Sequence, residues 1–108
     1  IDPQDWQALQ HGTTNAATLG LRDRARDLAE RALKTRPGAF SSYYNVACAY
    51  SILGDVDDAF ALLDRAVQHG RGNLEWIEHD PDFDNLRSDS RFDASRDRIR
   101  ANPAAPSP

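Results

Sequence analysis

The 108-residue chain contains no methionine and one cysteine, Cys48. A single cysteine cannot form an intrachain disulfide, so nothing in the composition points to an oxidising compartment, and we expect a cytoplasmic protein. No apolar run approaches the length of a membrane span, and no signal peptide is recognisable. Because a native protein starts with Met and this chain starts at Ile1, we expect a piece of a longer protein or a processed form.

The chain also lacks an excess of positive charge. Its net charge is −4, which argues against a general nucleic-acid surface. Six of the cations nevertheless crowd residues 22–36, where they are diluted by Asp23, Asp27 and Glu30. This segment is either a solvated helix face of mixed charge or a basic stripe for an acidic partner.

Strand signals are missing, because apolar and polar residues nowhere alternate with a period of two. A hydrophobic content of 40% with 28% charged residues is typical of a soluble globular protein. We therefore predict an all-α protein with one domain over residues 1–101, followed by a loose, proline-containing tail at 102–108.

Apolar side chains recur at helical spacing in four segments. Asp2-Pro3 starts the first helix and Gly20 ends it by permitting a left-handed turn. Further helices are expected over 22–36, from Ser41 or Ser42 to a stop at Gly54, and over 56–69. Their inward stripes are predicted to be Trp6, Leu9, Ala16 and Leu19; Ala25, Leu28, Ala29, Ala32 and Leu33; Tyr43, Val46, Ala47, Tyr50 and Leu53; and Ala59, Phe60, Leu62, Leu63, Ala66 and Val67.

The pattern changes after Gly72. Leu74, Trp76 and Ile77 indicate a short helix, and Asp80-Pro81 starts another that leads to Phe83 and Leu86. Asp89 or Ser90 is expected to cap a last helix, whose inward stripe carries Phe92, Ser95 and Ile99. The polar Ser95 on that stripe predicts a weak final helix.

Residues of one type recur 34 positions apart. A fixed period of this length is typical of stacked helical hairpins, which bind other chains more often than they catalyse. The recurring pairs are Leu19 and Leu53, Gly20 and Gly54, Asp23 and Asp57, Ala25 and Ala59, Leu28 and Leu62, Arg31 and Arg65, and Ala32 and Ala66.

The second hairpin resembles a tetratricopeptide repeat (TPR). The matching residues are Tyr43, Val46-Ala47, Tyr50, Leu53-Gly54, Ala59, Leu63 and Ala66, and the first hairpin keeps Leu19-Gly20, Ala25, Ala32 and Pro37. The second hairpin departs from the pattern at Arg71, where the repeat has proline. The first departs at Gly12-Thr13 and Ala16, which replace bulkier residues.

The resemblance implies a right-handed α-solenoid. It would consist of hairpin one (3–36), hairpin two (41–69) and divergent short capping helices (73–101). The segment from Leu74 to Phe92 is similar to the ending of TPR regions at the C-terminus of bacterial multidomain signalling and regulatory proteins.

TPR domains bind peptides along a concave groove lined by the first helix of each hairpin. Carried over by position, this implies a groove made of Gln10, His11, Thr14, Thr18, Ser41, Tyr44, Asn45, Cys48, Ser51 and Ile52. Tyr44 would supply apolar area and Asn45 would bond a peptide backbone. The groove has no cation, which argues against the TPR subtype that clamps a C-terminal carboxylate.

Metal and catalytic sites are weakly supported. Asp80, Asp82 and Asp84 match the first three alternating ligands of a calcium loop, but Asn85 stands where that loop needs Gly and Arg91 where it needs Glu. A lone histidine among carboxylates is a poor zinc site. We expect Asp80 to cap a helix instead, and no metal or cofactor to be bound.

Catalysis would use Cys48 as the nucleophile and His11 or His69 as the base. Nothing supplies a third, orienting group, so we expect no enzyme. The sequence therefore predicts a non-catalytic module that binds a peptide or protein partner, with no role for nucleic acid or membrane. Self-association is the alternative, because about three repeats are normally needed for stability and this chain offers two and a degraded third.

Overall fold

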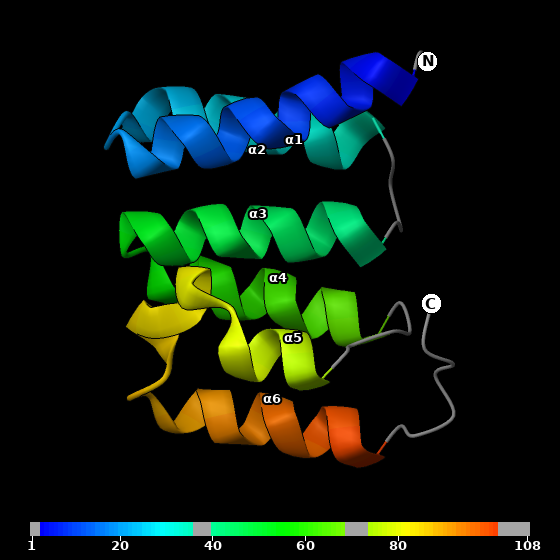
Figure 1. The fold of residues 1–108 in the computed structure, drawn as a ribbon, viewed down its shortest axis with the longest axis vertical. Helices are drawn as coiled ribbons and strands as arrows, with labels where there is room; N and C mark the ends of the chain where they lie inside the picture. The colour runs from blue at the N-terminus through cyan, green and yellow to red at the C-terminus, as the bar shows by residue number, and fades with distance from the viewer. Residues whose placement is uncertain (1–2, 36–39, 69–73, 102–108) are drawn as a thin grey trace.

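A computed structural model describes residues 3–35, 40–68 and 74–101 (Figure 1). Within these ranges the chain is helical and has no strand, which confirms the all-α prediction for them. The elements are α1 (Pro3–Thr18), α2 (Arg22–Thr35), α3 (Phe40–Leu53), α4 (Val56–Gln68), α5 (Leu74–His79), the 3-10 helix η1 (Pro81–Leu86) and α6 (Ser90–Ala101). Pro37-Gly38, His69 and the tail at 102–108 lie outside the described residues.

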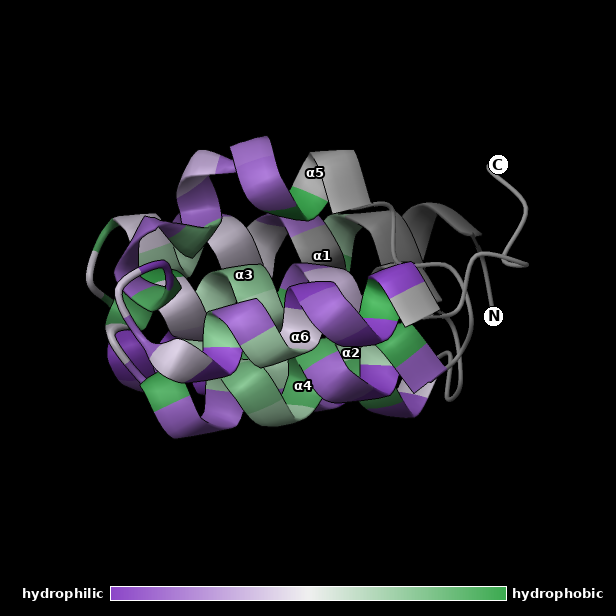
Figure 2. Cartoon of the chain, turned by 90° about the horizontal axis from the view of Figure 1, so that it is seen from below, coloured by the Kyte–Doolittle hydropathy of each residue, from purple (hydrophilic) through white to green (hydrophobic). Residues whose placement is uncertain are grey.

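From α2 onward, the α-helices start at intervals of 34 residues. α2, α4 and α6 begin at Arg22, Val56 and Ser90, and α3 and α5 begin at Phe40 and Leu74. We call α1–α2 hairpin one, α3–α4 hairpin two, and α5–η1–α6 the C-terminal unit. Figure 2 shows α1, α3 and α5 on one side of the molecule and α2, α4 and α6 on the other. The stack measures 34 × 30 × 19 Å.

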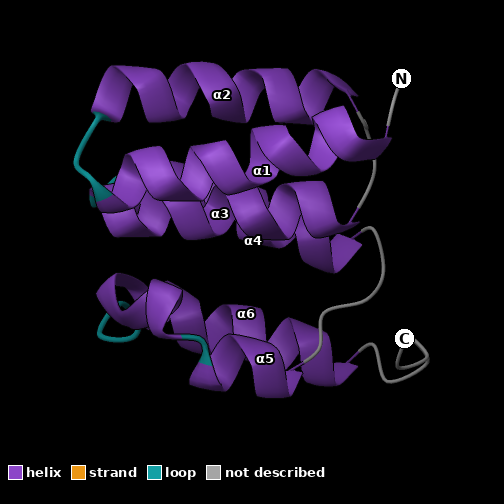
Figure 3. Ribbon diagram, turned by 45° about the horizontal axis from the view of Figure 1, so that its top comes forward, coloured by secondary structure: helices purple, strands orange, loops and turns teal. Residues whose placement is uncertain are grey.

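The turns of the two hairpins have the same geometry. Gly20 and Gly54 have positive φ, 76° and 82°. In each turn the glycine N–H donates to the carbonyl three residues back, and the next N–H donates to the carbonyl five residues back, at 2.9–3.0 Å. Glycine adopts this left-handed conformation without a Cβ clash, so the chain reverses at once into the next helix (Figure 3). The prediction that these glycines end their helices is confirmed.

The second helices of the hairpins bury one face each, as predicted. Ala25, Leu28, Ala29 and Ala32 of α2 and Ala59, Phe60, Leu63, Ala66 and Val67 of α4 are buried. Small alanines on both helices allow their backbones to approach the first helices closely. Leu19 departs from its predicted inward stripe: α1 ends at Thr18, and Leu19 remains 73% exposed in the turn.

α3 is buried on several sides rather than along one stripe. The predicted residues Tyr43, Val46, Ala47 and Tyr50 are buried, but so are Ser42, Tyr44, Cys48, Ala49 and Ser51. The cause is its central position, since α1, α2, α4 and η1 all contact it. The helix begins at Phe40, so the prediction that Ser41 or Ser42 would cap it is wrong; Ser42 is fully buried within the helix.

The C-terminal unit corresponds to a helical hairpin in which the first helix is interrupted. α5 and η1 together take the place of the first helix, and α6 is the second. Pro81 cannot donate the backbone hydrogen bond that a continuing helix needs, and its ring clashes with the preceding turn. α5 therefore ends at His79 and the chain continues as η1. Asp80 caps η1 as predicted, because its carboxylate accepts from the N–H of Asp82 at 3.0 Å.

Ion pairs and a shared core join the successive units. Arg26 contacts Asp55 at 2.9 Å and Asp58 at 3.0 Å, linking hairpin one to hairpin two. Arg91 of α6 contacts Asp57 at 2.8 Å, and its guanidinium lies 4.6 Å from the centre of the Phe60 ring. One cluster of buried residues runs from Ala29 in α2 to Ile99 in α6. Ser95 lies on the inward side of α6, as predicted, and is fully buried.

Candidate functional site

The predicted groove residues belong to α1 and α3, which lie side by side in one layer (Figure 2). On α1, His11 and Thr18 are exposed and Thr14 is half-buried. The hydroxyl of Thr18 donates to the carbonyl of Thr14 at 2.9 Å, so it is turned back onto its own helix. Gln10 lies in α1, but its side chain is outside the described part of the structure.

The α3 half of the predicted groove is mostly closed. Asn45 and Ile52 are half-buried, whereas Tyr44, Cys48 and Ser51 are 9%, 3% and 0% exposed. The expectation that these last three line an open groove is therefore wrong for this conformation, because η1 packs against α3. Ser41 lies in α3, and nothing is described of its side chain.

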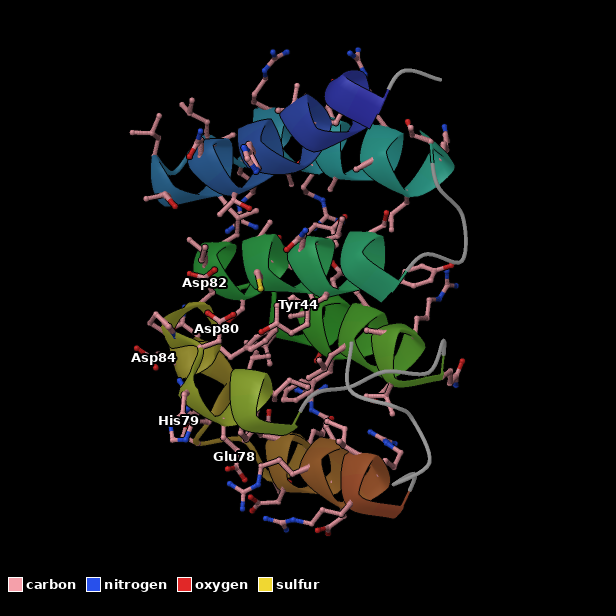
Figure 4. The ribbon with its side chains drawn as sticks, turned by 45° about the vertical axis from the view of Figure 1, so that its right-hand side comes forward. Tyr44, Glu78, His79, Asp80, Asp82 and Asp84 are labelled. Carbon is pink, nitrogen blue, oxygen red and sulfur yellow. The ribbon has the colours of Figure 1, made fainter. Side chains whose placement is uncertain are left out.

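Tyr44 is the central contact between α3 and the C-terminal unit. Its hydroxyl donates to Asp80 Oδ2 at 2.6 Å, and its ring meets Phe83 edge to face with centroids 5.3 Å apart. Figure 4 shows Tyr44 pointing from α3 toward Asp80. Burial raises the pKa of Tyr44, and the hydrogen bond to Asp80 raises it further, so the phenol stays protonated and remains a donor.

Arg87 and Asn85 make further hydrogen bonds that hold the segment from Ile77 to Arg87 in place over α3. Arg87 Nη2 donates to the carbonyls of Glu78 and Asp80, both at 2.8 Å, and to that of Ile77 at 3.3 Å. These carbonyls lie at the break between α5 and η1, where helical partners are missing. Asn85 Nδ2 donates to the carbonyl of Ser51 at 2.7 Å. The segment from Ile77 to Arg87 is thus fixed over α3 by polar contacts as well as by packing.

Cys48 meets Asp80 and Asp82 beneath this segment. The donor atoms of the three residues lie within 4.8 Å of one another, and the Cys48 thiol is 3.9 Å from Asp80 Oδ2. Thiolate and carboxylate are zinc ligands, so these three residues could hold a metal ion. Asp84, the third residue of the calcium-like run, is exposed and pairs with Arg87 instead.

The pKa of Cys48 is raised in this cluster, which disfavours its use as a nucleophile. Burial raises the pKa of Cys48, and the negative charges of Asp80 and Asp82 raise it further. Burial also raises the pKa of Asp82, with the charge of Asp80 as the second cause. A protonated thiol is a poor nucleophile. His11, its predicted base, is exposed on α1, and the other predicted base, His69, lies outside the described residues.

Sequence reasoning did not foresee that Cys48 and Asp80 would meet. The period of 34 carried the necessary signal, because it relates Cys48 to Asp82 and Ser51 to Asn85. Equivalent residues of successive units lie near one another in a stack. Applied to the C-terminal unit, the 34-residue period would have placed the acidic residues Asp80, Asp82 and Asp84 over α3.

Comparison with known proteins finds a relative that matches part of the chain. The chain is 40% identical over 50 residues to a chloroplastic protein of Arabidopsis thaliana. The match covers 46% of this chain and 15% of that protein, so the chain spans a small part of its relative's length. No family model matches the chain, and no solved structure matches it significantly.

The described helices carry no membrane-spanning candidate. None of them combines the length and the apolar character that crossing a bilayer would require.

Proposed function

We propose that this chain is a non-catalytic, TPR-like module that holds a peptide or protein partner, within a larger cytoplasmic protein. The observation that carries the proposal is the recurrence of structure every 34 residues, in the helix starts and in the two glycine turns. Repeats of this length stack into layers, and their exposed faces commonly bind other chains. The partial match to a much longer protein is compatible with a module inside a larger chain.

The partner would lie across α1 and the open part of α3. Exposed His11 and Thr18 and half-buried Thr14, Asn45 and Ile52 form this surface, and none of these five residues is a carboxylate, a lysine or an arginine. Ile52 would supply apolar area, and the histidine and amide side chains would bond the backbone of an extended peptide. Tyr44, Cys48 and Ser51 take no part, because they support the C-terminal unit.

Peptide selection followed by NMR tests this proposal. Peptides selected from a random library on the immobilised chain should shift the amide signals of His11, Thr14 and Asn45 in a saturable titration. His11→Ala should weaken binding of a selected peptide several-fold. His79→Ala is the matched control, since His79 is also exposed but lies on α5. Signal changes confined to α5, η1 or α6, or failure to select any peptide, would contradict the proposal.

A further inference from the structure

One thiol and two carboxylates meet between α3 and η1, and we call them the Cys48 cluster. Cys48 belongs to α3, whereas Asp80 caps η1 and Asp82 lies in its first turn. Their donor atoms lie within 4.8 Å of one another. Figure 4 shows the two aspartates where the C-terminal unit approaches α3. The calcium loop and the lone-histidine zinc site that the sequence argues against do not include Cys48, so this cluster is a different candidate.

The two carboxylates have no cation to balance them within the described residues. Both are half-buried, so water screens their mutual repulsion incompletely. The arginines of the C-terminal unit contact other acids: Arg87 contacts Asp84, Arg91 contacts Asp57 and Asp89, Arg96 and Arg100 contact Glu78, and Arg98 contacts Asp64. A cation bound between Asp80 and Asp82 would remove this repulsion.

A buried hydroxyl beside the cluster also lacks a partner. Ser51 lies one turn after Cys48 and is 0% exposed, and its Oγ makes no hydrogen bond to the described residues. Side chains three residues apart share a helix face, and each Cα–Cβ bond leans toward the N-terminus of the helix. The side chain of Ser51 therefore leans toward the turn that carries Cys48. A water bound to a metal ion in the cluster would supply the missing partner.

The donor set and its spacing suit zinc. Zinc accepts thiolate together with carboxylate, whereas calcium takes about six to eight oxygen ligands. Tetrahedral sulfur and oxygen ligands at the usual zinc bond lengths lie about 3.3–3.6 Å apart. The Cys48 thiol is already 3.9 Å from Asp80 Oδ2. The most distant donors, within 4.8 Å, need to approach by roughly 1 Å.

Asp80 is already held in the orientation that a metal ligand needs. Its Oδ1 accepts from the N–H of Asp82 at 3.0 Å, and its Oδ2 accepts from the Tyr44 hydroxyl at 2.6 Å. Each carboxylate oxygen has a further lone pair, so both bonds can remain while the carboxylate binds a metal. Hydrogen bonds to a metal-binding carboxylate fix its direction and increase metal affinity.

We propose that Cys48, Asp80 and Asp82 bind one Zn²⁺ ion, with a water molecule as the fourth ligand. The thiol proton passes to solvent as the sulfur–zinc bond forms, because thiolate is the form that binds metal. The ligands come from α3 and from the start of η1, so the ion fastens the C-terminal unit to hairpin two. Zinc that binds only this folded arrangement stabilises it. This role is independent of partner binding at the α1–α3 surface.

Calorimetric titration with zinc chloride tests the site on the complete, untagged chain, reduced and freed of metal with a chelator. One ion per chain should bind saturably. Cys48→Ser and Asp82→Asn should each weaken zinc binding at least about tenfold, since loss of a mere hydrogen-bond partner of a ligand costs about 10–100-fold. Asp84→Asn is the matched control. Asp84 is exposed and pairs with Arg87, so this variant should bind zinc as the original chain does.

Cobalt and thermal unfolding give two further measurements. Co²⁺ in the original chain should show the ultraviolet charge-transfer absorption of a thiolate ligand, and Cys48→Ser should lose it. Zinc should raise the unfolding midpoint of the original chain and of Asp84→Asn, but not that of Asp82→Asn. If circular dichroism shows that Cys48→Ser is unfolded, Asp82→Asn decides. No saturable zinc binding, undiminished binding by Asp82→Asn, or bound cobalt without the thiolate absorption would each overturn the proposal.

Discussion

The Tyr44 hydroxyl is one of the polar contacts that join hairpin two to the C-terminal unit. The bond to Asp80 involves an ionised acceptor, and bonds of this kind contribute about 1.5–3 kcal/mol. Tyr44→Phe keeps the contact with Phe83 but removes the donor. It should lower the free energy of unfolding by about 2 kcal/mol, measured by denaturant titration.

Ser51→Ala is the control on the same buried face. Ser51 Oγ is buried with no hydrogen-bond partner among the described residues, so its removal should leave stability unchanged or slightly higher. If Tyr44→Phe and Ser51→Ala lower the free energy of unfolding equally, then any substitution under η1 destabilises the fold. The Tyr44 hydroxyl would in that case make no specific contribution.

The Cys48 thiol makes the free energy of unfolding depend on pH in the alkaline range. In the folded chain burial and the nearby carboxylates raise the pKa of its thiol above the ordinary value of 9.0. Its stability contribution is therefore complete below about pH 9 and is lost as the pH rises further, because only the unfolded chain releases the proton. The expected slope is about 1.4 kcal/mol per pH unit, joined by Tyr44 above about pH 10.

Denaturant titrations between about pH 8 and pH 10 measure this slope. Cys48→Ala should flatten the profile in that interval, since the alanine chain has no thiol to ionise. An equally steep profile in the variant would mean that another group, and not Cys48, is responsible.

Burial of individual residues was predictable only where a helix has one inward face. The stripes of α2 and α4 followed from their spacing of apolar residues. Tyr44, Cys48 and Ser51 could not be assigned in this way, because the helical spacing of apolar residues within α3 does not reveal that η1 packs on its outer side. Only the 34-residue period carries that signal. The capping role of Asp80 was predictable, since it needs only the local Asp-Pro sequence.

The two glycine turns are equivalent elements and should respond equally to substitution. Both glycines have positive φ, and an added Cβ would meet nothing within 4 Å, so the cost is backbone strain alone. Gly20→Ala and Gly54→Ala should each lower the free energy of unfolding by about 1–2 kcal/mol. Thermal or chemical denaturation of the two variants provides the comparison.

Gly12→Ala is the matched control for these turns. Gly12 lies within α1, and a Cβ there would meet Leu28 Cδ1 at 3.4 Å, an ordinary contact. Alanine favours a helix interior over glycine by about 1 kcal/mol, so this variant should be more stable. If Gly20→Ala and Gly54→Ala differ widely from each other, the two turns are not equivalent and the repeat is only apparent.

Element boundaries were predictable where proline, glycine or aspartate defines them. Gly20, Gly54 and Pro81 stand at helix ends or breaks in the structure as in the sequence prediction. The start of α3 at Phe40 was missed, because serines near a helix start resemble caps even when one is buried within the first turn. The break between α5 and η1 was predictable, but the packing of η1 against α3 was not.

The whole molecule is a stack in which each unit covers the one before it. A core from Ala29 to Ile99 passes through all three units, and ion pairs cross both junctions. The final helix is polar on its exposed side, as the end of a stack should be. At the other end of the stack, hairpin one has an open groove between α1 and α2 that combines apolar residues with Arg24, Arg31 and Lys34.

Docking of the C-terminal unit on α3 is the central claim, because it removes Tyr44 from the proposed binding surface and leaves the open residues of α1 and α3. Native-state hydrogen exchange measured by NMR tests it most directly. The account predicts that the amides of Phe83 and Leu86 are protected nearly as strongly as those of Val46 and Ala47 in α3. Exchange of Phe83 and Leu86 at the rates of an unstructured peptide, with α3 still protected, would contradict it.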